Sequence, residues 1–271
     1  MSNPNQNSLL GSAPIPKLMV KMAVPAVVAQ VVNLLYNIVD RIYIGQGVGA
    51  MALTGVGLCM PLMMFMNAFA MLAGSGGAPR AAIAMGRGDK DEASKIMSNS
   101  FSLLLIFAVG ITTLYLSFAE PMLMMFGASS ETLPYSMDYV NIISWGAVFA
   151  LIVIGMNPYL TSQGFSTMAM MTTVIGAGIN IVLDPIFIFG LKMGVRGAAL
   201  ATVLSQAVGA LWVLLFLARG KKSILKITPA NMKLDGKIVG GILALGISGF
   251  VMISTESLLS ISFNSSLQKF G

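Results

Sequence analysis

Histidine is absent from this chain of 271 residues, and cysteine occurs only once, at Cys59. Without histidine, this stretch has no imidazole for catalysis, proton shuttling or metal binding. A single cysteine has no partner for a disulfide within the chain. The sequence also shows no metal-ligand cluster and no convincing pair of nucleophile and base. We therefore expect neither an enzyme nor a bound cofactor.

Charged residues are scarce as well. They make up 10% of the chain, whereas soluble domains carry about 25%. Hydrophobic residues make up 56%, and the mean hydropathy is +0.84. This composition predicts an all-α polytopic membrane protein with membrane lipids as its surroundings. The net charge of +6 does not indicate a nucleic-acid partner, because the basic residues are not gathered on one soluble face.

The sequence consists mainly of long apolar stretches. A helix needs about 20 residues to cross the hydrocarbon core of a membrane. Seven stretches are long enough, near residues 18–44, 51–78, 96–119, 135–160, 165–190, 195–218 and 238–263.

Basic residues are distributed unequally between the two sides of these spans. One side holds twelve, namely Lys17, Lys21, Arg80, Arg87, Lys90, Lys95, Arg219, Lys221, Lys222, Lys226, Lys233 and Lys237. The other side holds four, namely Arg41, Lys192, Arg196 and Lys269. Because cytoplasmic loops are enriched in Lys and Arg, we expect a multi-pass protein of the cell membrane (inner or plasma membrane) with a cytoplasmic N-terminus.

The longest polar connection runs from Arg219 to Lys237 and predicts a cytoplasmic linker between two units. We therefore expect a six-helix transmembrane lobe over residues 1–218, a linker over 219–237 and the first helix of a second lobe over 238–271.

An odd number of spans predicts a protein truncated after its seventh helix. The stretches 41–49 (RIYIGQGVG) and 263–271 (FNSSLQKFG) share Gln and Gly at matching places. Such similarity indicates a second repeat, as in many secondary transporters. Chance similarity between two helix ends is the alternative.

Two acidic residues, Asp40 and Asp184, lie inside predicted spans. A carboxylate at the centre of a membrane helix costs about 2.5–3.5 kcal/mol on the insertion scale. Such residues commonly mark ion or proton sites, so these two are the first candidates for a functional site.

Five polar residues share one face of the first span: Gln30, Asn33, Tyr36, Asn37 and Asp40. At 100° per residue they fall within an arc of about 120°. Polar groups in hydrocarbon need internal partners or water, so this stripe should face the bundle interior or a substrate cavity. Interhelical hydrogen bonding without a cavity is the alternative.

Helix depth predicts that four polar residues meet. Asn180 and Asp184 are one turn apart in the fifth span, and Thr202 lies in the sixth. Counted from the span ends at about 1.5 Å per residue, all three share the outer half of the membrane with Asp40. Together they would form an all-oxygen site for Na⁺ or hold a proton. In the alternative, each Asp pairs locally with a donor such as Arg41.

Three further residues are candidates for movement or for the cavity. Pro25 precedes Asp40 in the same helix and predicts a conformational hinge that ion binding would bias, with a static kink as the alternative. Asn157, followed by Pro158, should lie near the inner end of the fourth span and line a deeper part of a cavity. Glu256 is a further acid within a predicted span.

Three motifs in order resemble those of the multidrug and toxic compound extrusion (MATE) transporters, in their DinF/MepA-like branch. Residues 25–49 (PAVVAQVVNLLYNIVDRIYIGQGVG) resemble the first helix of that family. Residues 74–93 (GSGGAPRAAIAMGRGDKDEA) resemble the signature between its second and third helices. Residues 179–202 (INIVLDPIFIFGLKMGVRGAALAT) resemble its segment from helix five to helix six.

The resemblance implies twelve helices in two six-helix lobes, of which this chain would hold the first lobe and one further helix. It implies a monomeric antiporter that exports small amphipathic, often cationic, drug-like compounds in exchange for H⁺ or Na⁺. It places the cation site at Asp40, Asn180, Asp184 and Thr202, cavity positions at Tyr36 and Asn157, and the acid of helix seven at Glu256.

Two other functions compete with multidrug export. A lipid-linked oligosaccharide flippase of the same superfamily would need Arg in its cavity, but the spans contain Asp and almost no interior Lys or Arg. A non-transporting membrane receptor or scaffold would not respond to neutralisation of Asp40.

Overall fold

The computed structural model describes residues 14–220 and 223–267, and this part of the chain is helical throughout its regular structure. Lys221, Lys222, Lys269 and the end of the 263–271 motif lie outside the described residues. The elements are α2 (Ile15–Gly47), α3 (Ala50–Leu58), α4 (Met60–Gly86), α5 (Lys90–Met125), α6 (Leu133–Ser162), α7 (Ser166–Pro185), the π-helix η1 (Ile186–Gly190), α8 (Val195–Arg219), the 3₁₀-helix η2 (Pro229–Asn231) and α9 (Gly236–Leu267).

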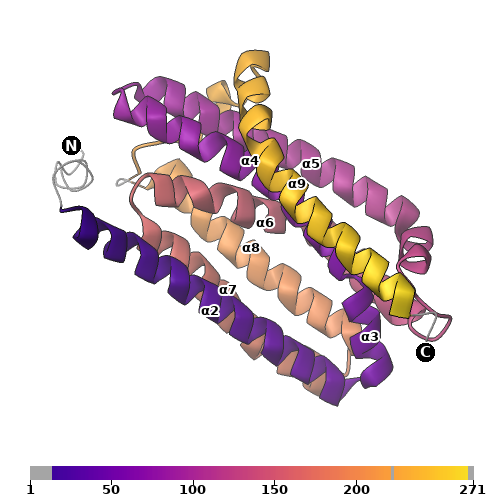
Figure 1. Cartoon of the computed structure of the whole chain (residues 1–271). Helices are drawn as coiled ribbons and strands as arrows, with labels where there is room; N and C mark the ends of the chain where they lie inside the picture. The colour runs from indigo at the N-terminus through magenta and orange to yellow at the C-terminus, as the bar shows by residue number, and fades with distance from the viewer. Residues whose placement is uncertain (1–13, 221–222, 268–271) are drawn as a thin grey trace.

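Seven helices of the described part are long and apolar enough to cross a membrane. They confirm the predicted all-α membrane fold and its seven spans, although most helices extend several residues beyond the predicted apolar stretches. Figure 1 shows them alternating in direction, with short connections at both ends of the bundle.

The second span departs from the prediction of one continuous helix, because it breaks at Cys59 into α3 and α4. Pro61 has no N–H and cannot donate to the carbonyl one turn earlier, so the helix cannot run through unchanged. Side chains of neighbouring helices donate to carbonyl groups in the first turn of α4, just after the break. Tyr115 of α5 donates to the carbonyl of Leu62 at 2.5 Å, and Ser257 of α9 donates to that of Pro61 at 3.0 Å.

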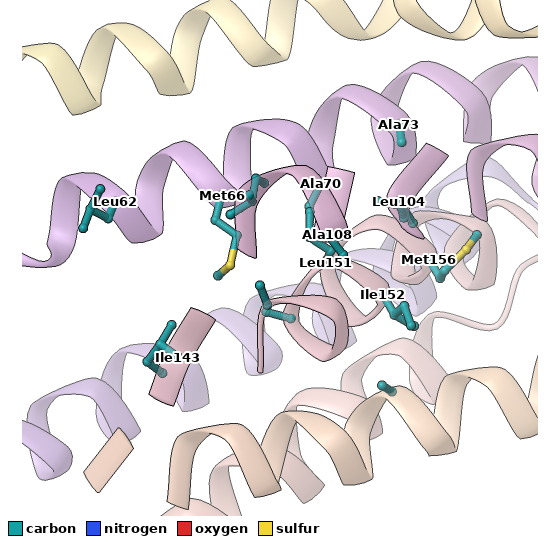
Figure 2. Packing of buried hydrophobic residues seen from close by; sticks show 14 of the residues in the cluster. Leu62, Met66, Ala70, Ala73, Leu104, Ala108, Ile143, Leu151, Ile152 and Met156 are labelled. Carbon is teal, nitrogen blue, oxygen red and sulfur yellow. The ribbon is translucent and has the colours of Figure 1, made fainter. Parts of the chain in front are cut away.

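Helix α6 lies at the centre and packs against α3, α4, α5, α7 and α8. Figure 2 shows the core between α4, α5 and α6, where Met66, Leu104 and Leu151 are buried. Small residues let these helices approach closely. A Cβ atom on Gly74 of α4 would lie only 2.6 Å from the carbonyl oxygen of Gly155 of α6.

The two ends of the chain pack on different partners. Helix α2 lies along α7, whereas α9 lies along α4 and also contacts α5, and Figure 1 shows the two helices on opposite sides of the bundle. The other faces of α2 are apolar and exposed, as at Val27 and Leu34, which suits contact with lipid.

The described part of the connection between α8 and α9 is hydrogen-bonded to the bundle near both of its ends. The buried Gln163 side chain accepts hydrogen bonds from the backbone N–H groups of Ile224, at 2.8 Å, and Leu225, at 3.1 Å. Further along, the buried Asn99 accepts from the N–H of Asp235 at 2.8 Å. The segment expected to be a linker is therefore docked against the first six spans.

Candidate functional site

The four residues predicted to meet do lie together, where α2, α7 and α8 pack against one another. Asp40 comes from α2, Asn180 and Asp184 come from successive turns of α7, and Thr202 comes from α8. Asp184 is fully buried, and Asn180 and Thr202 are 1% and 7% exposed.

Asn180 links the members of α7 and α8. Its side-chain amide donates to the Asp184 carboxyl group and to the Thr202 hydroxyl, each at 3.4 Å. Ser205, one turn further along α8, donates to the backbone carbonyl of Thr202 at 2.8 Å. The two bonds from Asn180 use the N–H groups of its amide, and its oxygen has no hydrogen-bond partner.

The two carboxyl groups, of Asp40 and Asp184, lie beside each other across the α2–α7 contact and interact directly. Two negative charges this close repel strongly away from water. Three buried oxygens here also lack a hydrogen-bond partner, namely Oδ1 of Asp40, Oδ1 of Asn180 and Oδ2 of Asp184. Buried polar atoms rarely stay unpaired, so this cluster fits a bound cation or a shared proton.

The basic residue next to the site, Arg41, forms no ion pair with it among the described residues. Arg41 donates to the sulfur of Met60 at 3.6 Å. Among residues 14–220 and 223–267, the one ion pair joins Arg196 and Asp138. The alternative of separate local pairs with Arg41 therefore has no counterpart in the described structure.

Two tyrosines border the cluster. Tyr36, from the predicted stripe on α2, lies near Asp40 and Asp184. Tyr139 of α6, which sequence reasoning missed, is buried with its hydroxyl beside Thr202 and with Asp40 nearby. Tyr139 lies about seven residues into α6 and so at the depth of Thr202. The depth argument applied to Thr202 could have found it.

The rest of the α2 stripe is only partly turned inward. Asn33 and Asn37 are half-buried, and the Asn37 amide donates to the Asn33 carbonyl at 2.7 Å. Gln30, one turn before Asn33, is exposed. The stripe therefore leaves the buried cluster as it runs toward the N-terminus.

None of the remaining candidates is hydrogen-bonded to the cluster in the described structure. The Asn157 amide donates to the carbonyl of Ala169 at 3.4 Å, and its oxygen is buried without a partner. Glu256 is exposed on α9, which packs on α4 and α5 rather than on α2. Pro25 lies within α2, which runs unbroken through it.

Comparison with known proteins identifies the relatives of this chain. A multidrug export protein, MepA of Staphylococcus haemolyticus (strain JCSC1435), is 27% identical over 255 residues, covering 94% of this chain and 56% of that protein. A crystal structure of MATE in the straight conformation is 31% identical with a TM-score of 0.84, covering 93% of this chain and 55% of that one. MATE in the bent conformation is 31% identical with a TM-score of 0.83, covering 92% and 55%.

The chain thus spans little more than half the length of the relatives it matches. A family model described as MatE matches residues 25–186, which is more than half of the chain. The chain therefore belongs to the MatE family, the family of the MATE transporters.

Proposed function

We propose that this chain is the cation-binding part of a multidrug antiporter, which exports amphipathic, often cationic compounds in exchange for H⁺ or Na⁺. The observation that carries the proposal is the group of three buried, unpartnered oxygens on Asp40, Asn180 and Asp184. The similarity to a protein named for multidrug export supports the export of drugs. In this proposal residues 1–218 form the first lobe, 219–237 the inter-lobe linker, and 238–271 the beginning of a second lobe.

Cation binding acts on the contact between α2 and α7. A proton or Na⁺ between Asp40 and Asp184 removes their mutual repulsion and draws the two helices together. The cation must bind one conformation of the transporter more tightly than the other, because only this difference in affinity shifts the equilibrium. The all-oxygen ligand set of two carboxyl groups, an amide and the Thr202 hydroxyl suits a hard cation.

In this proposal, the conformational change occurs as a bend of α2. Pro25 removes one backbone hydrogen bond of this helix and makes bending there less costly. MATE relatives have been solved in straight and bent conformations, which supports two states of the fold. Bending would move the residues assigned to the substrate cavity on α2, namely Gln30, Asn33, Tyr36 and Asn37, relative to Asn157 and Glu256.

Efflux of ethidium from energised vesicles tests this function in the full-length protein. H⁺ and Na⁺ gradients are imposed separately, and Asp40→Asn is compared with the parent. We expect the variant to lose gradient-driven efflux because an amide neither releases a proton nor provides a negative ligand. The gradient that drives efflux in the parent identifies the coupling ion.

Asp138→Asn serves as the matched control, since this aspartate is partly exposed and pairs with Arg196 rather than with a residue of the cluster. It should retain efflux. If Asp40→Asn reaches the membrane and exports ethidium like the parent, the cluster is structural and the antiporter proposal fails. In that case a receptor or scaffold role gains support.

A further inference from the structure

A polar cavity lies away from the carboxylate cluster, between the beginning of α5 and the segment that leads into α9. Its volume is about 270 Å³. It is lined by Lys95, Asn99, Ala230, Asn231, Lys233, Leu234, Asp235 and Ile238.

The walls of this cavity are held in place by Asn99, which is 1% exposed. Its amide donates to the carbonyls of Lys95, at 3.0 Å, and Asn231, at 3.3 Å, while its oxygen accepts from the N–H of Asp235. Both sides of the cavity are therefore joined through one buried side chain, and the cavity is preformed.

The charge of the lining favours an anion. Lys95 and Lys233 are exposed, and neither forms an ion pair within the described ranges. Asp235 brings the opposing charge, but its Oδ1 already accepts from the N–H groups of Lys237, at 2.8 Å, and Ile238, at 3.4 Å. The carboxylate thus caps the first turn of α9 and keeps its charge, so the lining carries two ammonium groups against one carboxylate.

The cavity lies at the depth of lipid headgroups. Helix α5 has 36 residues and is about 54 Å long, well beyond the hydrocarbon thickness of about 30 Å. Lys95 belongs to its second turn, and Ile238 belongs to the first turn of α9. Leu234, 44% exposed, adds an apolar surface beside the lysines.

We propose that this cavity binds a phosphate-bearing anion, and that its source is the headgroup of an anionic phospholipid. Lys95 and Lys233 hold the phosphate, and Leu234 contacts the glycerol and the first methylene groups of the lipid. Basic pockets between membrane helices commonly bind such headgroups. The site is independent of the carboxylate cluster and of transport.

Native mass spectrometry of the purified full-length protein, with phosphatidylglycerol or phosphatidylcholine added, tests this site. The parent should retain phosphatidylglycerol in preference to phosphatidylcholine. Lys95→Gln and Lys233→Gln should each weaken its retention about fivefold, since a lysine near an anionic headgroup contributes that much. Asp235→Asn should strengthen it, because the amide can still cap α9 while a repelling charge is lost.

The matched control is the double variant Lys90→Gln/Lys226→Gln, which removes two exposed lysines outside the cavity lining. It should retain the lipid like the parent. Equal losses in this control and in Lys95→Gln/Lys233→Gln overturn the site in favour of general surface charge.

Leu234→Ser and added inorganic phosphate separate the two sources of the anion. A lipid ligand predicts that Leu234→Ser weakens phosphatidylglycerol retention and that millimolar phosphate does not displace it. Displacement by phosphate with no effect of Leu234→Ser assigns the cavity to a soluble anion and overturns the lipid as source.

Discussion

At the scale of single residues, the cluster depends on Asn180, because its amide joins α7 to α8 through Asp184 and Thr202. One carboxyl oxygen on each of two helices, Oδ1 of Asp40 and Oδ2 of Asp184, is left without a donor. Such an arrangement is costly unless a cation or proton completes it. In the proposed function, the oxygens that repel one another here are the same ones that would bind the cation.

Thr202→Val tests whether the Thr202 hydroxyl binds the cation and accepts the hydrogen bond from Asn180. Valine has nearly the same shape but leaves an N–H of Asn180 unpaired, so we expect a loss of about 1–3 kcal/mol in stability. Stabilisation of the protein by Na⁺ should also diminish, provided that Na⁺ is the coupling ion. Thermal unfolding at several Na⁺ concentrations measures both effects.

Thr202→Ser is the control, because it keeps the hydroxyl and removes only a methyl group. It should unfold close to the parent and retain the same response to the coupling ion. A valine variant as stable as the serine variant would contradict the hydrogen-bonding role of Thr202.

At the scale of elements, close approach between helices depends on glycine at a few positions. Gly76 of α4 faces α9, where an added Cβ would overlap the carbonyl of Ile242. The helix backbone cannot yield as a flexible side chain does. The lack of a side chain at Gly76 therefore allows α9 to pack closely on α4 at this point.

Gly76→Ala should destabilise the protein by about 1–3 kcal/mol, because it overpacks the α4–α9 contact. Gly86→Ala is the control in the same helix, since a Cβ there meets no atom within 4 Å. Thermal unfolding in detergent should show a lower Tm for the first variant and no loss for the second. Equal Tm values for the two variants would contradict the close contact.

Gln163→Leu tests the docking of the segment before α9. Leucine removes the acceptor for the N–H groups of Ile224 and Leu225, so the segment should detach from the bundle. We expect faster cleavage by a protease within residues 223–235. Gln163→Glu keeps the acceptor but loses the donation to the carbonyl of Tyr159 at 3.0 Å, so it should be cleaved more slowly than Gln163→Leu.

At the scale of the whole molecule, the excess of basic residues on one side predicts a cytoplasmic N-terminus. Cysteine labelling tests this orientation without background labelling of the native cysteine, because Cys59 is fully buried. Ser130 and Asp91 are both exposed and are expected on opposite sides of the membrane. In intact cells, an impermeant maleimide should therefore label Ser130→Cys, and it should label Asp91→Cys only after permeabilisation. The reverse pattern would invert the topology.

Local chemistry made much of the site predictable. Asp40, Asn180, Asp184 and Thr202 stand out as polar residues at one depth in apolar spans, and the structure brings them together. Tyr139 did not stand out, because a tyrosine in an apolar helix is ordinary until its neighbours are known. Gln30 looked equivalent to the rest of its stripe, yet it is exposed.

The sequence by itself determined that this is a helical membrane protein with seven spans among its described residues, because hydropathy and helix length act within each segment. Only the tertiary structure decided that Gln163 and Asn99 dock the segment before α9, and that α9 lies along α4. These outcomes depend on contacts between residues distant in the chain, which small side chains permit and which no local pattern specifies.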